Sequence, residues 1–177
     1  IHTGDCNQIL TRDVFPLVRY DQYRRGLCLL DPYGLHLHWE VVRAAADTRA
    51  VEIFLNFPVA DMNRNVFWQN PEGVAPDDIA RMTAFWGDDS WRKIAYTPIP
   101  TLFGGPVDMK TADNRTIADA YRRRLKEVAG FKYVPEPIPM RNSKNAVAYY
   151  LFFASSNPTG AKIVKEIFDR YRNYGVR

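Results

Sequence analysis

Two short apolar segments with a helical pattern between them dominate the first third of the chain. Residues 26–31 read Gly-Leu-Cys-Leu-Leu-Asp and end in a turn signal, which predicts a strand buried on both faces. Residues 35–46 then predict a helix with four apolar positions at helical spacing: Leu35, Trp39, Val42 and Ala46. Residues 50–56 predict a second buried strand. A strand, a helix and a strand over roughly 30 residues indicate a βαβ crossover with parallel strands.

The middle of the chain favours helices. Residues 61–96 read mostly as helix, with Pro76 as a first-turn residue. Residues 97–111 are rich in proline and glycine and predict a loop, serving as a lid or as an excursion between layers. Residues 116–129 predict a further helix that stops at Gly130.

The last part of the chain predicts a hairpin and a helix. Residues 131–134 and 146–154 read as strands, and the polar turn at residues 141–145 should join them in an antiparallel hairpin. Residues 159–173 predict the final helix. Its expected sheet-facing residues are Ile163, Val164, Ile167 and Phe168.

These elements predict an α/β sheet of about four strands, two parallel and then an antiparallel hairpin. That arrangement is the C-terminal portion of a Rossmann-like (class I methyltransferase-like) sheet, whose other half would supply the first strands and a glycine-rich cofactor loop. We expect one α/β domain over residues 1–177, truncated at its N-terminus, with a helical and loop insertion at residues 61–111. The truncation is expected because Ile1 replaces an initiating Met and because residues 4–7 look like a strand exit.

Composition narrows the class of protein but not its function. The apolar fraction of 46% and the charged fraction of 25% are ordinary for a globular domain. A formal net charge of +4 permits nucleic-acid binding without requiring it. The two cysteines form no CxxC motif or Cys/His cluster, so we expect no zinc site and a reducing, cytoplasmic environment. No signal peptide or membrane span is predicted.

The sharpest motif is Asp31-Pro32-Tyr33-Gly34, which follows the first predicted strand. Ligands of open α/β sheets bind beyond the carboxyl ends of strands. The motif resembles the Asp/Asn-Pro-Pro-Tyr/Phe loop of methyltransferases that modify amino groups of nucleic acids, where an exocyclic amine is held and an aromatic ring stacks on the base. It departs from that loop by having one proline and an aromatic residue two places after the acid. The alternative is a tight turn in which Asp31 caps the next helix.

Polar residues follow two other predicted strand ends. Asp5 and Cys6 lie in a turn that resembles the acidic turn that binds the adenine amine of S-adenosylmethionine, so we predict that they bind cofactor. Asn56 ends the second strand, so its amide should point into the same crevice as Asp31.

Asn63 and Arg64 come shortly after the second strand and are candidate substrate contacts. An arginine here could bind a phosphate or carboxylate in bidentate fashion, or it could pair with Asp61 on the surface.

Other candidate features have competing interpretations. His36, His38 and Glu40 do not suggest a metal site, because helical positions two apart point to different faces. The basic run at residues 122–126 reads as a solvated helix face, with contact to RNA or DNA as the alternative. The helical segment at residues 61–96 contains an aromatic stripe, which indicates core packing more than a stacking surface. Its residues are Trp68, Phe85, Trp86 and Trp91.

With these residues in view, the chain resembles the three-Cys-motif partner (TcmP) family. The resemblance covers essentially the whole chain and is carried, in order, by residues 31–35, 51–58, 62–65, 85–92 and 148–154. It implies a Rossmann-like, methyltransferase-like fold in bacterial proteins encoded beside a three-Cys-motif protein that resembles radical S-adenosylmethionine enzymes. Family members carry an upstream Phe-Ala-Gly-Pro-Gly type loop, the expected cofactor cradle. The present chain lacks that loop, so it should bind S-adenosylmethionine poorly or not at all and be inactive alone.

Three functional hypotheses follow. The leading one is that the parent uses S-adenosylmethionine to methylate a nucleic acid or a nucleotide-like substrate. In it, Asp31 and Asn56 hold the acceptor amine, Tyr33 stacks, Pro32 belongs to the substrate loop, and Asp5 binds the cofactor adenine. The second is a non-catalytic scaffold for the three-Cys-motif protein, docking through the aromatic-rich helices. The third is nucleic-acid binding without chemistry through residues 122–126.

The first predicted strand also affects association. An isolated half-sheet would expose the edge of residues 26–31, which invites pairing with another copy. We therefore expect a homodimer or a tendency to aggregate.

Overall fold

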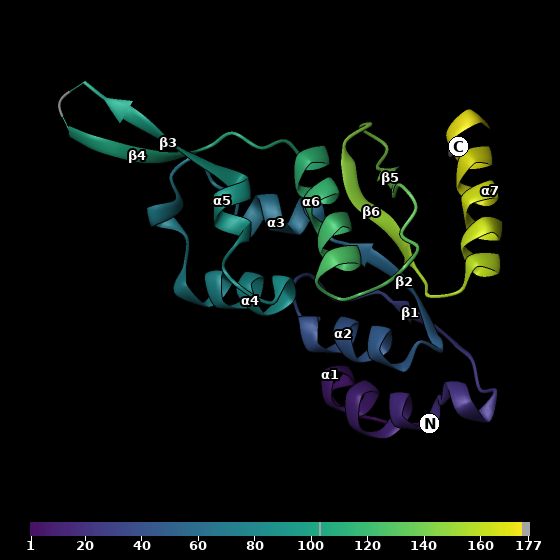
Figure 1. Cartoon of the computed structure of the whole chain (residues 1–177). Coiled ribbons are helices and arrows are strands. Elements are labelled where there is room, and N and C mark those ends of the chain that lie inside the picture. The colour runs from purple at the N-terminus through teal and green to yellow at the C-terminus, as the bar shows by residue number, and fades with distance from the viewer. Residues whose placement is uncertain (103, 175–177) are drawn as a thin grey trace.

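The computed structural model describes residues 1–102 and 104–174 and shows an α/β fold (Figure 1). Its strands are β1 (Gly26–Leu30), β2 (Val51–Phe57), β3 (Tyr96–Thr101), β4 (Gly104–Lys110), β5 (Ile138–Arg141) and β6 (Val147–Ala154). Its α-helices are α1 (Cys6–Ile9), α2 (Trp39–Thr48), α3 (Val59–Asn65), α4 (Pro76–Trp86), α5 (Trp91–Ala95), α6 (Asn114–Glu127) and α7 (Pro158–Tyr174). Short helical turns fill much of residues 10–22 and residues 71–73.

The main sheet has four strands in the order β1-β2-β6-β5. β1 and β2 are parallel, with Gly26 opposite Val51 and Leu30 opposite Leu55, so the predicted βαβ crossover is confirmed. β6 runs antiparallel to both β2 and β5, which confirms the predicted C-terminal hairpin.

The first strand of that hairpin is wrongly placed in the prediction. It is β5, whereas residues 131–134 contribute only the isolated bridge from Tyr133 to Ser155. Phe131 and Val134 are both buried in the main core, although residues three apart on a strand point to opposite faces. The apolar pattern of this segment therefore reflects packing of a connecting segment and not strand alternation.

The two faces of the sheet are covered unequally. The larger core lies on the face of α2 and α6, where alternate residues of β2, from Val51 to Phe57, are buried. On the opposite face, α7 packs Val164 and Phe168 over Phe54 and Phe153, and Figure 1 shows it apart from the other helices. Ile163 and Ile167 remain 53% and 45% exposed, so their predicted contact with the sheet is wrong.

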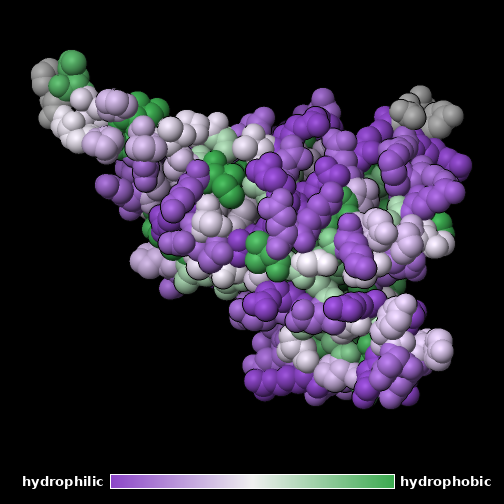
Figure 2. Space-filling view, in the orientation of Figure 1, coloured by the Kyte–Doolittle hydropathy of each residue, from purple (hydrophilic) through white to green (hydrophobic). Residues whose placement is uncertain are grey.

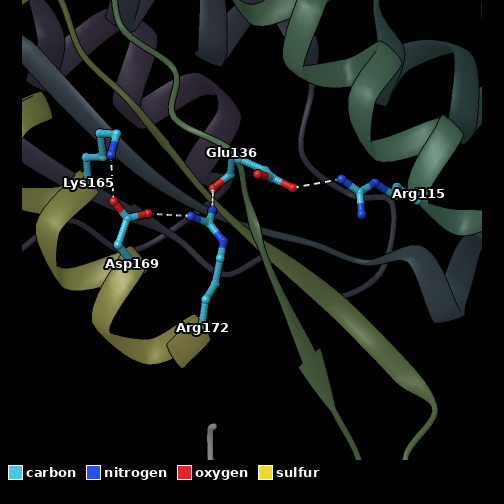
Figure 3. A network of polar contacts seen from close by, with 5 residues as sticks. All are labelled: Arg115, Glu136, Lys165, Asp169 and Arg172. Carbon is cyan, nitrogen blue, oxygen red and sulfur yellow. Dashed lines mark hydrogen bonds and ion pairs between the residues drawn. The ribbon is translucent and has the colours of Figure 1, made fainter. Parts of the chain in front are cut away.

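A polar network holds α7 beside the connection that leads into β5 (Figure 3). Arg172 donates to the backbone carbonyl of Glu136 and, over 2.8 Å, to Asp169, which also accepts from Lys165. The Glu136 carboxylate pairs at 3.0 Å with Arg115 of α6. Exposed ion pairs contribute little free energy each, so this network orients α7 more than it stabilises it.

β1 is not buried on both faces, contrary to the prediction. Leu27 is 57% exposed and Leu29 is 72% exposed, while Leu30 is buried. β1 lies at the edge of the sheet, and no element of residues 1–102 or 104–174 covers its face on the α7 side.

The segment predicted as a loop at residues 97–111 is an antiparallel hairpin, β3–β4, that extends away from the body of the protein (Figures 1 and 2). Proline cannot donate to a sheet ladder, but a two-stranded ribbon has free edges towards which its nitrogen can point. Pro98 and Pro100 are therefore tolerated in β3. The predicted helices at residues 61–96 are present as α3, α4 and α5.

The helix predicted from Leu35 begins later, at Trp39. Leu35 and Leu37 are buried in the connection from β1, only 3% and 2% exposed, so they continue the apolar pattern without belonging to α2. This connection contains Gly34, whose positive φ of 56° ends any regular structure there.

An aromatic cluster around Tyr121 of α6 connects the elements that enclose the larger core. The Tyr121 ring lies 4.7 Å from that of Phe57 (β2), 5.3 Å from Trp86 (α4) and 5.7 Å from Trp39 (α2), measured between ring centroids. The expected core role of the aromatic stripe is confirmed for Phe85, Trp86 and Trp91, each 1% exposed, but not for Trp68, which is 44% exposed.

Gly87, which follows α4, should not tolerate a side chain. Its φ is 100°, and a Cβ atom would lie 2.4 Å from Cδ1 of the buried Trp39. We expect Gly87→Ala to lower the free energy of unfolding by about 2 kcal/mol, through backbone strain and displacement of the ring. Gly105→Ala is the control, because no atom of the described residues, apart from its chain neighbours, lies within 4 Å of its Cβ position. Equal urea midpoints for the two variants would contradict this expectation.

The Tyr121 hydroxyl is fully buried and has no hydrogen-bond partner among the residues that the structure describes. Burial raises the pKa of this hydroxyl, so it stays neutral. We expect Tyr121→Phe to raise the free energy of unfolding by about 1 kcal/mol, because it removes an unsatisfied polar group. Tyr96→Phe should have the opposite sign, since the Tyr96 hydroxyl donates to the Val66 carbonyl over 3.0 Å. Calorimetric unfolding of both variants gives the comparison.

Candidate functional site

A cleft of about 490 Å³ lies beyond the carboxyl ends of the parallel strands β1 and β2. It is lined by the 31–36 connection, α3, α4 and the start of β6. The polar and aromatic side chains that line it include Asp31, Tyr33, Asn56, Arg64, Arg81 and Tyr149. This is the end of a parallel sheet at which ligands of α/β proteins bind.

The strand register brings Asp31 and Asn56 together. Leu30 is opposite Leu55, so the next residues, Asp31 and Asn56, face each other on the same side of the sheet. The Asn56 amide Nδ2 donates to Asp31 Oδ1 over 2.7 Å.

This hydrogen bond leaves two acceptors at the cleft. Asp31 Oδ2 and Asn56 Oδ1 receive no hydrogen bond from any residue that the structure describes. A carboxylate can accept several hydrogen bonds and a primary amide oxygen two. The pair is therefore suited to a ligand group that carries two N–H donors.

The connection after Asp31 presents an aromatic ring to solvent. Tyr33 is 90% exposed, and its ring lies 6.1 Å from that of His36 with 28° between the planes. Gly34 allows the bend, and a Cβ atom there would approach Asp61 Oδ2 to 2.6 Å. Asp31 does not cap α2, whose N-cap is His38 without a side-chain hydrogen bond.

Arg64 lies in the cleft because α3 starts directly after β2 and Pro58. It has no carboxylate partner within 4.0 Å in the part of the chain that the structure describes, so the alternative pairing with Asp61 is not found there. Asp61 instead accepts from the Asn65 side chain over 3.0 Å. The Arg64 guanidinium is thus available to an anionic group of a ligand.

Asn63 points elsewhere, although it precedes Arg64. Its side chain accepts from Lys110 over 2.7 Å and donates to Asn114 over 2.8 Å, which ties α3 to β4 and α6. Burial lowers the pKa of Lys110. The structure therefore places Asn63 outside the cleft that holds Asp31, Asn56 and Arg64.

Asp5 and Cys6 also lie outside the cleft lining. Asp5 caps α1 by accepting from the Asn7 backbone over 3.0 Å, and no strand precedes it among the described residues. Asn7 holds this turn beside the cleft loop: its side chain donates to the His36 carbonyl over 2.9 Å and accepts from the His38 amide over 2.8 Å. The acidic turn is thus a neighbour of the site.

Arg81 and Tyr149 line the cleft but were not predicted from the sequence as site residues. Arg81 of α4 forms an ion pair with Asp78 at the rim, and Tyr149 enters from the start of β6. Tyr149 is there because β6 pairs antiparallel with β2, with Tyr150 opposite Phe57. The hairpin predicted from the sequence indicates that this segment joins the sheet, but it does not give the register that places Tyr149 in the cleft.

Two residues of the basic run in α6, Arg122 and Arg124, make contacts within the protein. Arg124 is 10% exposed in its side chain, donates to the Trp86 carbonyl over 2.5 Å and pairs with Asp88 at 2.6 Å. Arg122 donates to the Val134 carbonyl over 2.8 Å. Of the basic residues in the run, Arg123 and Lys126 are exposed, whereas Arg122 and Arg124 are half-buried, which leaves a small basic surface.

A larger hollow, of about 640 Å³, lies elsewhere and is a weaker candidate. It is lined by residues near Phe15 and Arg49, which precedes β2, so it lies at the opposite end of the parallel strands. Its lining does not join polar residues from two strand ends as the Asp31 cleft does.

Three further observations bear on the possible function of this chain. Within residues 1–102 and 104–174, His, Cys, Asp and Glu side chains form no group of three or more that could hold a metal ion. No helix in that part of the chain has the length and apolar character to cross a membrane. Comparisons with protein-family models, curated proteins and solved structures give no match to this chain.

Proposed function

We propose that this chain is the substrate-binding part of a methyltransferase-like protein, and that its cleft holds an amino group of a nucleic acid or nucleotide-like substrate. The observation that carries the proposal is the Asp31–Asn56 pair, which presents two free acceptors at the ends of two parallel strands. An exocyclic amine of adenine or cytosine has two N–H bonds that match them.

The surrounding residues support a planar, anionic ligand. Tyr33 offers an exposed ring on which a base can stack, with a stabilisation of about 1–3 kcal/mol per base. Arg64 offers a guanidinium without a protein partner in the described chain, which suits a phosphate. Amine acceptors, a stacking ring and an anion-binding group thus lie in one cleft.

In this proposal, Asp31, Asn56 and Tyr33 orient the acceptor amine of the substrate. An amine whose two N–H bonds are held by Asp31 and Asn56 has its nitrogen fixed relative to the ring stacked on Tyr33. Such positioning is a large part of catalysis of group transfer. The arrangement of β1, β2, β5 and β6 supports the proposal, because a parallel pair followed by an antiparallel hairpin is expected of this fold class.

The described residues do not form a cradle for S-adenosylmethionine. Asp5 and Cys6 are exposed at the start of a four-residue helix and line neither the Asp31 cleft nor the hollow near Phe15. No glycine-rich turn follows a parallel strand and opens a helix in this part of the chain. We therefore assign no described residue of this chain to S-adenosylmethionine.

The proposal predicts selective nucleotide binding by this chain. AMP and CMP, which carry an exocyclic amine, should bind at least about tenfold more tightly than IMP and UMP, which carry a carbonyl there. Asp31→Ala should abolish this preference, because it removes an acceptor and the partner of Asn56. Arg64→Ala should weaken all four nucleotides alike, since it acts on the phosphate. Calorimetric titration measures each affinity.

Asp77→Ala is the matched control, as Asp77 is an exposed carboxylate of α4 that does not line the cleft. It should bind like the unmodified chain. Equal affinity for AMP and IMP in the unmodified protein would rule out the amine-binding role.

A second candidate function is a scaffold for a three-Cys-motif protein encoded nearby. The observation that favours it is the projecting β3–β4 hairpin (Figure 2), on which Ile99, Val107 and Met109 share one face and are each more than a third exposed. Trp86 and Trp91, which lie in the aromatic-rich helices expected to dock a partner, are buried in the core and unsuited to this role.

If the hairpin docks the partner, the double variant Ile99→Ser/Met109→Ser should lose at least about 90% of the co-purified three-Cys-motif protein, because two exposed apolar contacts are removed. Val128→Ser is the control, since Val128 is 51% exposed at the end of α6. Affinity capture with quantified partner bands is the measurement. Retention of the partner by the double variant would exclude the hairpin as the docking site.

A further inference from the structure

The hollow of about 640 Å³ at the end of the parallel strands opposite the Asp31 cleft is of a size that holds small molecules. Its walls come from four separate parts of the chain. They are the helical turns at residues 15–22, the end of α2 with the connection to β2, the connection from α6 to β5, and the connection from β6 to α7. Side chains distant in sequence therefore converge on one space, unlike the charges that follow one another along α6.

Two cations of this hollow lack a partner within the protein. Arg49 and Lys132 have no carboxylate within 4.0 Å in the part of the chain that the structure describes. Among the described residues that line the hollow, Asp21 is the one acidic residue, and Arg19 already pairs with it through hydrogen bonds of 3.0 and 2.5 Å. The lining therefore carries two positive charges that no carboxylate neutralises.

The backbone of Arg49 has a conformation that glycine usually adopts. Arg49 is the C-cap of α2, with a φ of 54° and a ψ of 9°, in the left-handed region that a side chain makes unfavourable. Its amide donates to the Ala46 carbonyl over 3.0 Å. The Thr48 hydroxyl accepts from the amides of Ala50 and Val51 over 3.1 and 3.0 Å. These bonds hold the strained turn, and a role for the guanidinium explains why an arginine occupies it.

Backbone hydrogen bonds place Lys132 beside Ser156. Tyr133 and Ser155 form an antiparallel bridge and exchange two N–H···O bonds of 2.9 Å. In such a pair the flanking residues Lys132 and Ser156 lie opposite each other, and both line the hollow. An ammonium group and a hydroxyl group each donate hydrogen bonds, so the two side chains can bind the same anion.

Another part of the wall is apolar and aromatic. Phe15 and Val18 contribute apolar surface, and Tyr20 is 60% exposed. Arg25 lies over the Tyr20 ring, 4.0 Å from its centroid, and does not line this hollow, so the ring presents its other face or its edge there. A planar or apolar group attached to an anion therefore has a surface against which it can pack.

We propose that this hollow binds a small phosphomonoester, with its phosphate between Arg49 and Lys132 and its organic group against Tyr20. A phosphate monoester carries close to two negative charges at neutral pH and three acceptor oxygens. These match two cations and the Ser156 hydroxyl, and an arginine can bind phosphate in bidentate fashion. A carboxylate would neutralise only one of the two cations. This inference does not depend on the proposed function of the cleft.

Calorimetric titration with phenyl phosphate tests the proposal on the 177-residue chain carrying Arg64→Ala, so that the arginine of the cleft does not contribute. We expect one saturable site. Arg49→Gln/Lys132→Gln should raise its dissociation constant at least about tenfold, because two charge-assisted contacts are lost. Arg43→Gln/Lys126→Gln is the matched control, since it removes the same charge from exposed positions outside the hollow. No binding, or an equal loss in both double variants, would overturn the proposal.

Two further measurements use no variant of the hollow itself. On addition of phenyl phosphate to the Arg64→Ala chain, the amide NMR signals of Tyr20, Arg49 and Ser156 should shift, and those of Asp31 and Asn56 should not. Benzenesulfonate has the same ring with a single negative charge and should bind at least about tenfold more weakly. Shifts confined to the cleft, or equal affinity for the two ligands, would contradict a phosphate site between Arg49 and Lys132.

Discussion

The aromatic cluster around Tyr121 is the contact on which the position of the cleft depends. It joins side chains from α2, α4, α6, β2 and β6, which are distant in sequence. Phe57 of β2 is completely buried in it. Because successive residues of a strand point to opposite faces, burying Phe57 turns Asn56 away from this core and towards Asp31. The chemistry of the cleft is therefore coupled to the packing of a residue that does not line it.

The parallel pairing of β1 and β2 supplies the second half of this constraint. A crossover helix between the strands fixes their direction, and the apolar residues of β2 fix their register. The site then needs only residues that follow the strands immediately: Asp31 after β1, and α3 with Arg64 after β2. Asn56 and Arg64 lie within β2 and α3, and Asp31 directly follows β1, whereas Tyr33 lies on a connection and its side chain is 90% exposed.

The sequence was informative where local periodicity and packing agree. β1, α2, β2, α6, β6 and the meeting of Asp31 with Asn56 were predictable, because a βαβ unit brings successive strand ends to one edge. The β3–β4 hairpin was not, since its prolines suggest a loop and a free ribbon tolerates them. The direction of Asn63 was equally hidden, because its partners, Lys110 and Asn114, lie about 50 residues further along the chain. Long-range polar contacts of this kind leave no periodic signal.

The exposure of β1 shows why apolar composition alone misleads about burial. Gly-Leu-Cys-Leu-Leu has the pattern of a central strand, yet only the face towards α2 is covered in the described structure. A strand with this sequence is stable at an edge only at the cost of exposed leucine side chains and unpaired backbone groups. Because Asp31 continues directly from Leu30, any strand that pairs with this edge also borders the cleft. The apolar edge of β1 and the Asp31 side of the cleft are thus joined by one short segment of backbone, so this edge is part of the environment of the cleft.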